Sequence, residues 1–183
     1  MQSENLIQTL LEQTRQVINQ AEKLKTYDLR ILTWKEQETS WSILECLEHL
    51  NLYGNFYLPQ IESKIKSSDT EPELEFKSGF LGNYFAESML PKEKLNKMKT
   101  FKDKNPLNAN LDKTVIDKFI HQQIKLLDLL NQSRTVSLNN VKISTSISGL
   151  LKLKLGDTFQ FFINHILRHL NQIERIQIAI KNA

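Results

Sequence analysis

The stretch that decides the fold is residues 161–180, which read FFINHILRHLNQIERIQIAI. With about 100° of rotation per residue, one side of a helix collects Phe162, Ile166, Ile173, Ile176 and Ile180. His165 and His169 are four residues apart and stack on that side, His169 within the apolar stripe and His165 at its border. Two imidazoles that face a core need partners there, and a metal ion is one partner that suits this geometry. The opposite, solvated side carries Asn164, Arg168, Asn171 and Arg175.

The composition of the whole chain is typical of a helical, globular protein. Its 183 residues favour one domain over residues 1–183, large enough to bury a core of its own. Gly and Pro are few, at 5 and 4, while Leu, Ile, Lys, Glu and Gln are abundant, which favours helices. The net charge of +3 is too small to indicate a nucleic acid as partner.

The sequence also predicts the environment of the protein. Its single cysteine, Cys46, excludes an internal disulfide and suits the reducing cytoplasm. The first residues, MQSENLIQ, lack the basic region and apolar run of a secretory signal. No stretch approaches the roughly 20 apolar residues that a membrane span needs. We therefore expect a soluble, cytoplasmic protein without a membrane partner.

Three more stretches have the apolar spacing of helices. Residues 3–25 form the first, with Ser3 as its N-cap. The second begins at Ser42, where Glu45 three residues later completes a capping box, and it extends to about residue 66. Pro59 should kink or interrupt this helix, because proline lacks an N–H and clashes with the preceding turn.

The third of these helices covers residues 112–131 and has Asp112 as its N-cap. Its His121 falls with Asp117 and Asp128 on the polar side, so we expect a surface histidine.

The segment of residues 67–111 has little regular patterning. A loop of this length in a folded domain is usually functional or disordered. Six lysines lie between Lys92 and Lys104, interspersed with Glu93 and Asp103 and without arginine. This mixture favours a solvated surface over a phosphate-binding one.

The other connectors are residues 26–40 and 135–156. Within the latter, residues 141–147 have the alternating, β-branched pattern of extended chain. Gly156 should break the chain, so that Asp157 or Thr158 caps the last helix. Four long helical patterns with two long connectors predict an all-α four-helix bundle with crossover connections, because simple up-and-down order needs short loops.

A third histidine has the placement that His165 has. On the second helix, His49 lies at the edge of the apolar face. Taken alone, each histidine is most simply a residue at the core edge with a hydrogen-bond partner. Three of the four histidines on the core-facing borders of two helices also form the arrangement through which bundles bind metals, with positions left open for water or substrate. Spacing alone leaves these two interpretations in balance.

Two stretches, SWSILECLEHLNLY at residues 40–53 and FFINHILRHLNQIERI at residues 161–176, resemble the DinB-like superfamily of metal-binding proteins, and within it the broad DinB-2 group. KMKTF followed by Pro106 is also similar to the middle of such proteins, so the resemblance spans nearly the whole chain. The family has a Trp-Ser helix start and Glu-His-Leu on helix two, then His-x-x-x-His-Leu-x-Gln-Ile on helix four. The matching residues are Trp41, Ser42, Glu48, His49 and Leu50, then His165, His169, Leu170, Gln172 and Ile173.

The resemblance implies a four-helix bundle in up-down-down-up order that is often homodimeric. It also implies a divalent metal, nickel or zinc among them, bound by His49, His165 and His169. Characterised relatives in this superfamily include S-transferases that use bacillithiol or mycothiol, a thiol-dependent isomerase, and proteins described as metal-dependent hydrolases. The resemblance therefore specifies the metal site better than the substrate.

We expect a metal-dependent enzyme with a small-molecule substrate, most simply an S-transferase that uses a low-molecular-weight thiol. The metal would bind the thiol and favour its thiolate for attack on an electrophile. Glu45 is the candidate catalytic residue, which would orient an imidazole or take a proton, and Gln172 would hydrogen-bond a bound water or ligand. An ordinary capping glutamate and an ordinary polar helix residue are the alternatives. Tyr53 and Phe56 should line the pocket, and Cys46 should be a buried apolar residue.

Two other functions use the same residues. Hydrolysis by a metal-activated water would need the same three histidines, so the sequence does not separate it from thiol transfer. The bundle could also be a non-catalytic binding or stress-response protein, with or without metal.

Overall fold

The amphipathic stretches fold into four long helices within the residues that the computed structural model describes, 1–90 and 100–182. The long helices are α1 (Ser3–Leu24), α3 (Ile43–Lys66), α5 (Thr114–Gln132) and α6 (Leu155–Lys181). The connections contain the short helices α2 (Leu29–Leu32) and α4 (Phe80–Ser88) and the 3-10 helices η1 (Lys102–Lys104) and η2 (Ser133–Thr135). They also contain the antiparallel strands β1 (Lys142–Ser144) and β2 (Lys152–Lys154), in which Ile143 pairs with Leu153.

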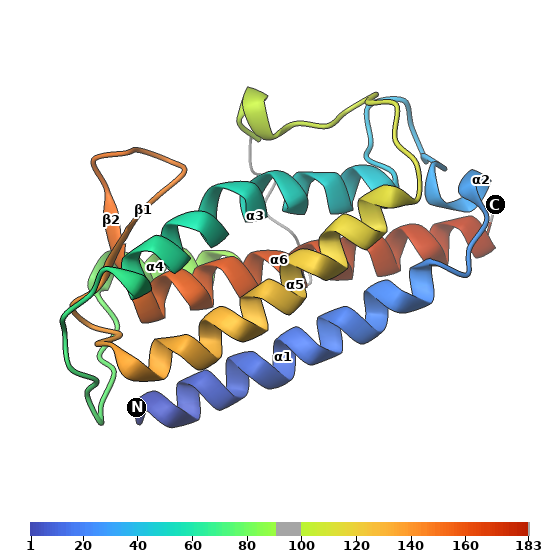
Figure 1. Ribbon diagram of the computed structural model, residues 1–183. Helices are drawn as coiled ribbons and strands as arrows, with labels where there is room; N and C mark the ends of the chain where they lie inside the picture. Colours follow the sequence, from blue (N-terminus) through green and yellow to red (C-terminus); the bar gives the residue numbers. More distant parts are fainter. Residues whose placement is uncertain (91–99, 183) are drawn as a thin grey trace.

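The long helices form a bundle in which α1 and α6 run in one direction and α3 and α5 in the opposite one (Figure 1). α1 packs against α5 and α6, and α3 packs against the same two helices. Because α3 and α5 are parallel, the chain returns along the length of the bundle between them. The order along the chain is up, down, down, up, which confirms the predicted all-α bundle.

The core lies between these helices and consists of the apolar stripes seen in the sequence. α1 contributes Leu10 and Val17, α5 contributes Phe119, and α6 contributes Phe159 and Phe162, all of them buried. Each such side chain stabilises the fold by about 1.5–3 kcal/mol relative to an exposed one. Among the described residues, none of the helices combines the length and the apolar character that crossing a membrane requires.

The start of α1 differs from the prediction. Ser3 is the first helical residue and Gln2 occupies the N-cap position without a side-chain hydrogen bond. A backbone contact replaces the cap, because the N–H of Ser3 donates to the carbonyl of Leu74 at 2.8 Å, and the N–H of Phe76 donates to the carbonyl of Met1. The segment before α4 thus satisfies the N-terminus of α1.

α3 begins as predicted. The Ser42 hydroxyl accepts from the N–H of Glu45, and the Glu45 carboxylate accepts from the N–H of Ser42, which completes the capping box. Pro59 does not interrupt α3, which is continuous from Ile43 to Lys66, and the kink that the sequence predicts as the alternative stays a prediction. Pro59 and Asn55 are both exposed, so water can satisfy the Asn55 carbonyl that lacks an N–H partner. Leu58 and Ile61 are buried on the other side and hold the helix against the core.

The segment of residues 67–111 has more structure than its pattern indicates. It contains α4, which packs against α6 and β2, and η1, which packs against α3. A helix of nine residues is too short to show a clear period in the sequence. Most of the lysine-rich stretch, residues 91–99, lies outside the described residues.

The other connectors depart from the prediction in smaller ways. Residues 26–40 contain α2, and the extended part of residues 141–147 is confirmed as β1. α5 begins at Thr114 rather than after Asp112, although the Asp112 carboxylate still accepts from the N–H of Thr114.

The break predicted at Gly156 is wrong, because α6 begins at Leu155, with Lys154 in the N-cap position. Gly156 lies inside the first turn, where an added Cβ would come within 2.5 Å of the Phe76 ring. Asp157 does not cap α6, since its carboxylate accepts from the hydroxyl of Ser78 and the N–H of Gly79. Glycine is therefore used here for close packing, and Asp157 ties the start of α6 to the segment before α4.

Candidate metal centre

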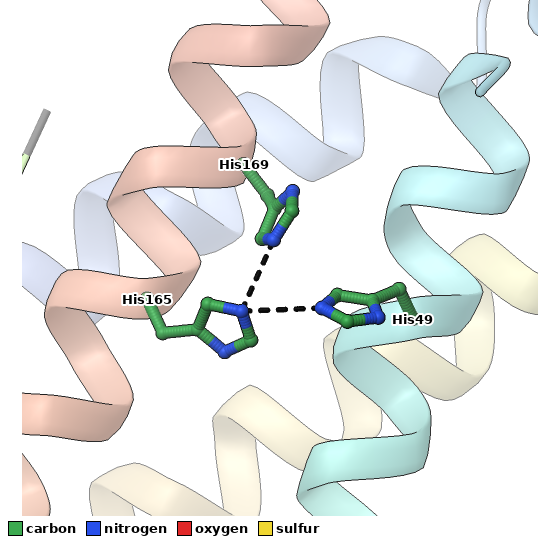
Figure 2. A group of neighbouring side chains, drawn as sticks. All are labelled: His49, His165 and His169. Carbon is green, nitrogen blue, oxygen red and sulfur yellow. Dashed lines mark hydrogen bonds between the residues drawn. The ribbon is translucent and has the colours of Figure 1, made fainter. Parts of the chain in front are cut away.

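The three predicted histidines converge between α3 and α6 (Figure 2). The Nε2 atom of His165 lies 3.2 Å from Nε2 of His49 and 3.0 Å from Nε2 of His169. One ligand atom from each of the three lies within 4.8 Å of the others. The side chains are 3–8% exposed, so the cluster is buried.

The local sequence explains this convergence. α3 and α6 are antiparallel neighbours in the bundle, and the capping box at Ser42 fixes where α3 begins. His49 then lies on the second turn of α3 and faces α6. His165 and His169 are one turn apart on α6, so both reach the same point between the helices.

Two of the imidazoles have their tautomer set by the partner of Nδ1. The Nδ1 atom of His49 lies 2.6 Å from the carbonyl oxygen of Lys104, and a carbonyl can only accept. The Nδ1 atom of His169 lies 2.9 Å from Oε1 of Gln172. Both Nδ1 atoms therefore carry the proton, and both Nε2 atoms present a lone pair to the centre.

This donor set fits a divalent metal. Ligand nitrogens at about 2.0–2.1 Å from a tetrahedral zinc lie about 3.3 Å from each other. The observed separations of 3.0 and 3.2 Å are close to that value. Without a cation, the single N–H of His165 can be donated to Nε2 of His49 or to Nε2 of His169, but not to both. The nitrogen that receives no proton would then face His165 with an unshared lone pair and be repelled. The residues present thus match three of the four positions of a catalytic metal site and leave one open.

Burial keeps the three imidazoles neutral. It lowers the pKa of His49 to about 4 and the pKa of His169 to about 3. The pKa of His165 also lies well below its ordinary value, because of burial first and the neighbouring His169 second. Protons therefore do not compete for the lone pairs at neutral pH, which favours metal binding.

Aromatic side chains surround the cluster. The Trp41 ring lies 4.7 Å from the ring of His49 and 5.8 Å from that of His169, centroid to centroid. Tyr53 lies edge-on to His165 at 4.6 Å, and Phe161 stacks on the same imidazole at 6.2 Å. Tyr53 is buried and lines the site as predicted, while the role of Phe56 as pocket wall stays a prediction. Trp41 and Phe161 are not among the predicted site residues, although Trp41 belongs to the motif at the start of α3.

Glu45 lies one turn before His49 and is 2% exposed, but it does not bond to an imidazole within the described part of the chain. Its Oε1 atom accepts from Lys35 Nζ at 2.7 Å and from the N–H of Asn108, and its Oε2 atom accepts from the N–H of Ser42 at 2.8 Å. Its role as a proton acceptor in catalysis stays a prediction.

Gln172 lies at the site, and its predicted hydrogen bond to a bound water or ligand stays a prediction. Its Oε1 atom accepts from Nδ1 of His169, so it orients one of the candidate metal ligands. The backbone carbonyl of Lys104 orients His49 in the same way, by accepting from its Nδ1. No sequence pattern predicts this contact, because every residue has a backbone carbonyl.

Three other residues were assigned from the sequence. Cys46 is fully buried as predicted, and burial raises the pKa of its thiol, so it packs as an apolar residue. His121 is exposed as predicted, and its Nδ1 lies 2.8 Å from the Asp117 carbonyl of its own helix. The solvated position expected for Arg168 is wrong, because it is 8% exposed. α4 covers that side of α6, where the Asn164 amide donates to the Ala86 carbonyl.

Comparisons with known proteins place the chain in a family. Neither the curated proteins nor the solved structures contain a match to this chain. The family model of the DinB superfamily, however, matches residues 10–173. This range covers all four long helices in whole or in part and includes His49, His165 and His169. The chain therefore belongs to the DinB superfamily.

Proposed function

We propose that the protein binds one divalent metal ion, zinc or nickel, through His49, His165 and His169, and uses it to transfer a low-molecular-weight thiol to an electrophilic small molecule. The convergence of three buried Nε2 atoms, two of them with fixed lone pairs, carries the metal part of this proposal. Membership of the DinB superfamily supports it. The thiol part rests on the resemblance to thiol-dependent transferases.

A metal bound here would supply Lewis-acid chemistry that lowers the pKa of a coordinated thiol or water. The chain's own residues supply the surroundings. Trp41 and Tyr53 cover the imidazoles and exclude water, which strengthens electrostatic interactions inside the site. Burial raises the pKa of Tyr53 to about 12, so its hydroxyl keeps the proton at neutral pH and acts as a hydrogen-bond donor, not as a base.

The proposal is tested on protein purified without a histidine tag. Elemental analysis should find about one divalent metal ion per chain. Incubation with thiols and electrophiles should give conjugates in a metal-dependent reaction, whereas esters and amides should not react. Cleavage of esters or amides would indicate a metal-activated water instead. Neither activity, together with no bound metal, would overturn the proposal in favour of a non-catalytic binding protein.

A further inference from the structure

Residues 101–108, which we call the strap, hold one metal ligand from outside the bundle. The strap contains η1, which packs against α3. Its Lys104 carbonyl accepts from Nδ1 of His49 at 2.6 Å. The tautomer of His49, and with it the direction of the Nε2 lone pair, thus depends on a backbone segment that lies 55 residues away in sequence.

The first anchor of the strap is Trp41. Its Nε1–H donates to Oδ1 of Asn105 at 3.2 Å, and the same oxygen accepts from the N–H of Leu107. Because the Trp41 ring also packs against His49, this anchor lies directly beside the ligand that the strap holds.

The second anchor is Glu45. Its Oε1 atom accepts from the N–H of Asn108, and Lys35 Nζ bridges Glu45 Oε1 and Asn108 Oδ1 at 2.7 and 2.9 Å. Asn108 has a φ of 63°, in the left-handed region that asparagine adopts more readily than most residues other than glycine. Burial by itself would raise the pKa of Glu45, but the Lys35 ammonium and the two backbone N–H groups outweigh it and lower that pKa. The carboxylate is therefore charged when it binds the strap.

We propose that Glu45 is a positioning residue of the metal centre, which holds the strap so that the Lys104 carbonyl fixes His49 with its Nε2 lone pair toward His165. This inference rests on the metal binding proposed above. When the strap is released, His49 loses the acceptor of its Nδ1 proton. The imidazole then also populates the tautomer with hydrogen on Nε2, which has no lone pair on that atom to bind a metal between the three histidines.

A purely structural role of Glu45 as a helix cap can be separated from this one by Glu45→Gln. Glutamine also completes a capping box, with its single amide oxygen on the N–H of Ser42. Its NH2 group then faces the Asn108 N–H and the Lys35 ammonium, which are both donors. The substitution therefore keeps the cap and breaks the anchor.

The affinity for Co2+ or Zn2+, measured by competition with a chelator, should fall about tenfold or more in Glu45→Gln. The matched control is Glu62→Gln, the same change on the same helix, where the carboxylate pairs with Lys66 and Lys125. This control should keep the affinity of the wild type. A second variant, Asn105→Ala, removes the side-chain oxygen that accepts from Trp41 and should also lower the metal affinity. Because Asn105 is exposed, the substitution leaves the packing of the core unchanged.

The tautomer of His49 gives a readout that a structural role would not change. In the metal-free wild type, the nitrogen NMR shifts of His49 should show a protonated Nδ1, and in Glu45→Gln and Asn105→Ala a mixture of tautomers. Unchanged affinity together with an unchanged His49 tautomer in both variants would overturn the proposal. If the wild type bound no metal, the function proposed above would fail. The His49 tautomer in the metal-free protein would still test whether the strap fixes that imidazole.

Discussion

At the residue scale, the three imidazoles differ in what holds their second ring nitrogen. A backbone carbonyl holds His49, and the side chain of Gln172 holds His169. The Nδ1 atom of His165 is buried without a hydrogen-bond partner among the described residues. His165 is thus positioned by packing between Tyr53 and Phe161, while His49 and His169 are positioned by hydrogen bonds.

The ligand histidines should be separable from the surface histidine by metal content. His49→Ala and His169→Ala should each lose the bound metal, since two remaining imidazoles hold a divalent ion far more weakly than three. His121→Ala should retain about one metal per chain, because His121 is exposed on α5 and bonds only to its own helix among the described contacts. Elemental analysis of the tag-free proteins checks this, and equal metal content in wild type and all three variants would contradict the assignment.

Gln172 should influence metal affinity through the orientation of His169. Gln172→Leu removes the acceptor of the Nδ1 proton, so the affinity should fall roughly tenfold. Gln172→Glu keeps an acceptor oxygen and should bind at least as tightly as the wild type, since a carboxylate accepts more strongly than an amide. Chelator competition measures both, and equal loss in the two variants would show that the acceptor is not what matters.

At the element scale, the start of α6 depends on a close approach that only glycine allows. The ring of Phe76, 1% exposed, occupies the space beside Gly156 where a Cβ would stand. The contact joins the first turn of α6 to the segment that also pairs with the N-terminus of α1. Three pieces of chain are thereby fixed at the same end of the bundle.

Gly156→Ala should therefore destabilise the protein by about 1–3 kcal/mol, because the buried ring must move. The control is Gly149→Ala, in the connection between β1 and β2, where an added Cβ has no neighbour within 4 Å. This control should be neutral or slightly stabilising, since alanine restricts the unfolded chain. Urea denaturation of both variants tests the prediction, which fails if Gly156→Ala is as stable as the wild type.

At the scale of the whole molecule, burying neutral histidines makes the metal-free fold sensitive to acid. The ordinary pKa of histidine is 6.5, whereas burial lowers that of His49 to about 4 and that of His169 to about 3. Between about pH 6.5 and pH 4, the unfolded chain therefore binds more protons than the folded one. The free energy of unfolding must fall as the pH falls through this window.

The free energy of unfolding of the metal-free protein should thus decrease between pH 7.5 and pH 5.5, by on the order of 1 kcal/mol per pH unit for each buried histidine. Glu4 and Glu62, whose pKa values are lowered to about 2 by Arg134 and Lys125, contribute only at lower pH. Urea denaturation in the presence of a chelator measures the effect. His49→Gln should reduce the pH dependence, and equal stability of the wild type at both pH values would contradict the burial of neutral imidazoles.

Much of this molecule could be predicted from the sequence, because its information is local and periodic. The apolar spacing of three and four residues locates the long helices to within a few residues, and Ser42 with Glu45 marks the start of α3. The same spacing places His49, His165 and His169 on core-facing borders. The short helix α4 gives no such signal, and the sequence wrongly predicts a break at Gly156 because the residue that packs against it, Phe76, is distant in sequence.

By itself, the sequence determined the all-α bundle and the three histidines of the candidate metal centre, since amphipathic period and side-chain type are properties of single helices. Only the tertiary structure decided which atoms meet. In it, the Lys104 carbonyl accepts a hydrogen bond from His49, and Gln172 accepts one from His169. Arg168 is buried, and the Glu45 carboxylate binds Lys35 and the N–H of Asn108. These contacts join residues from different elements or depend on rotamers chosen by packing, and backbone carbonyls carry no residue identity. Local periodicity therefore cannot encode them.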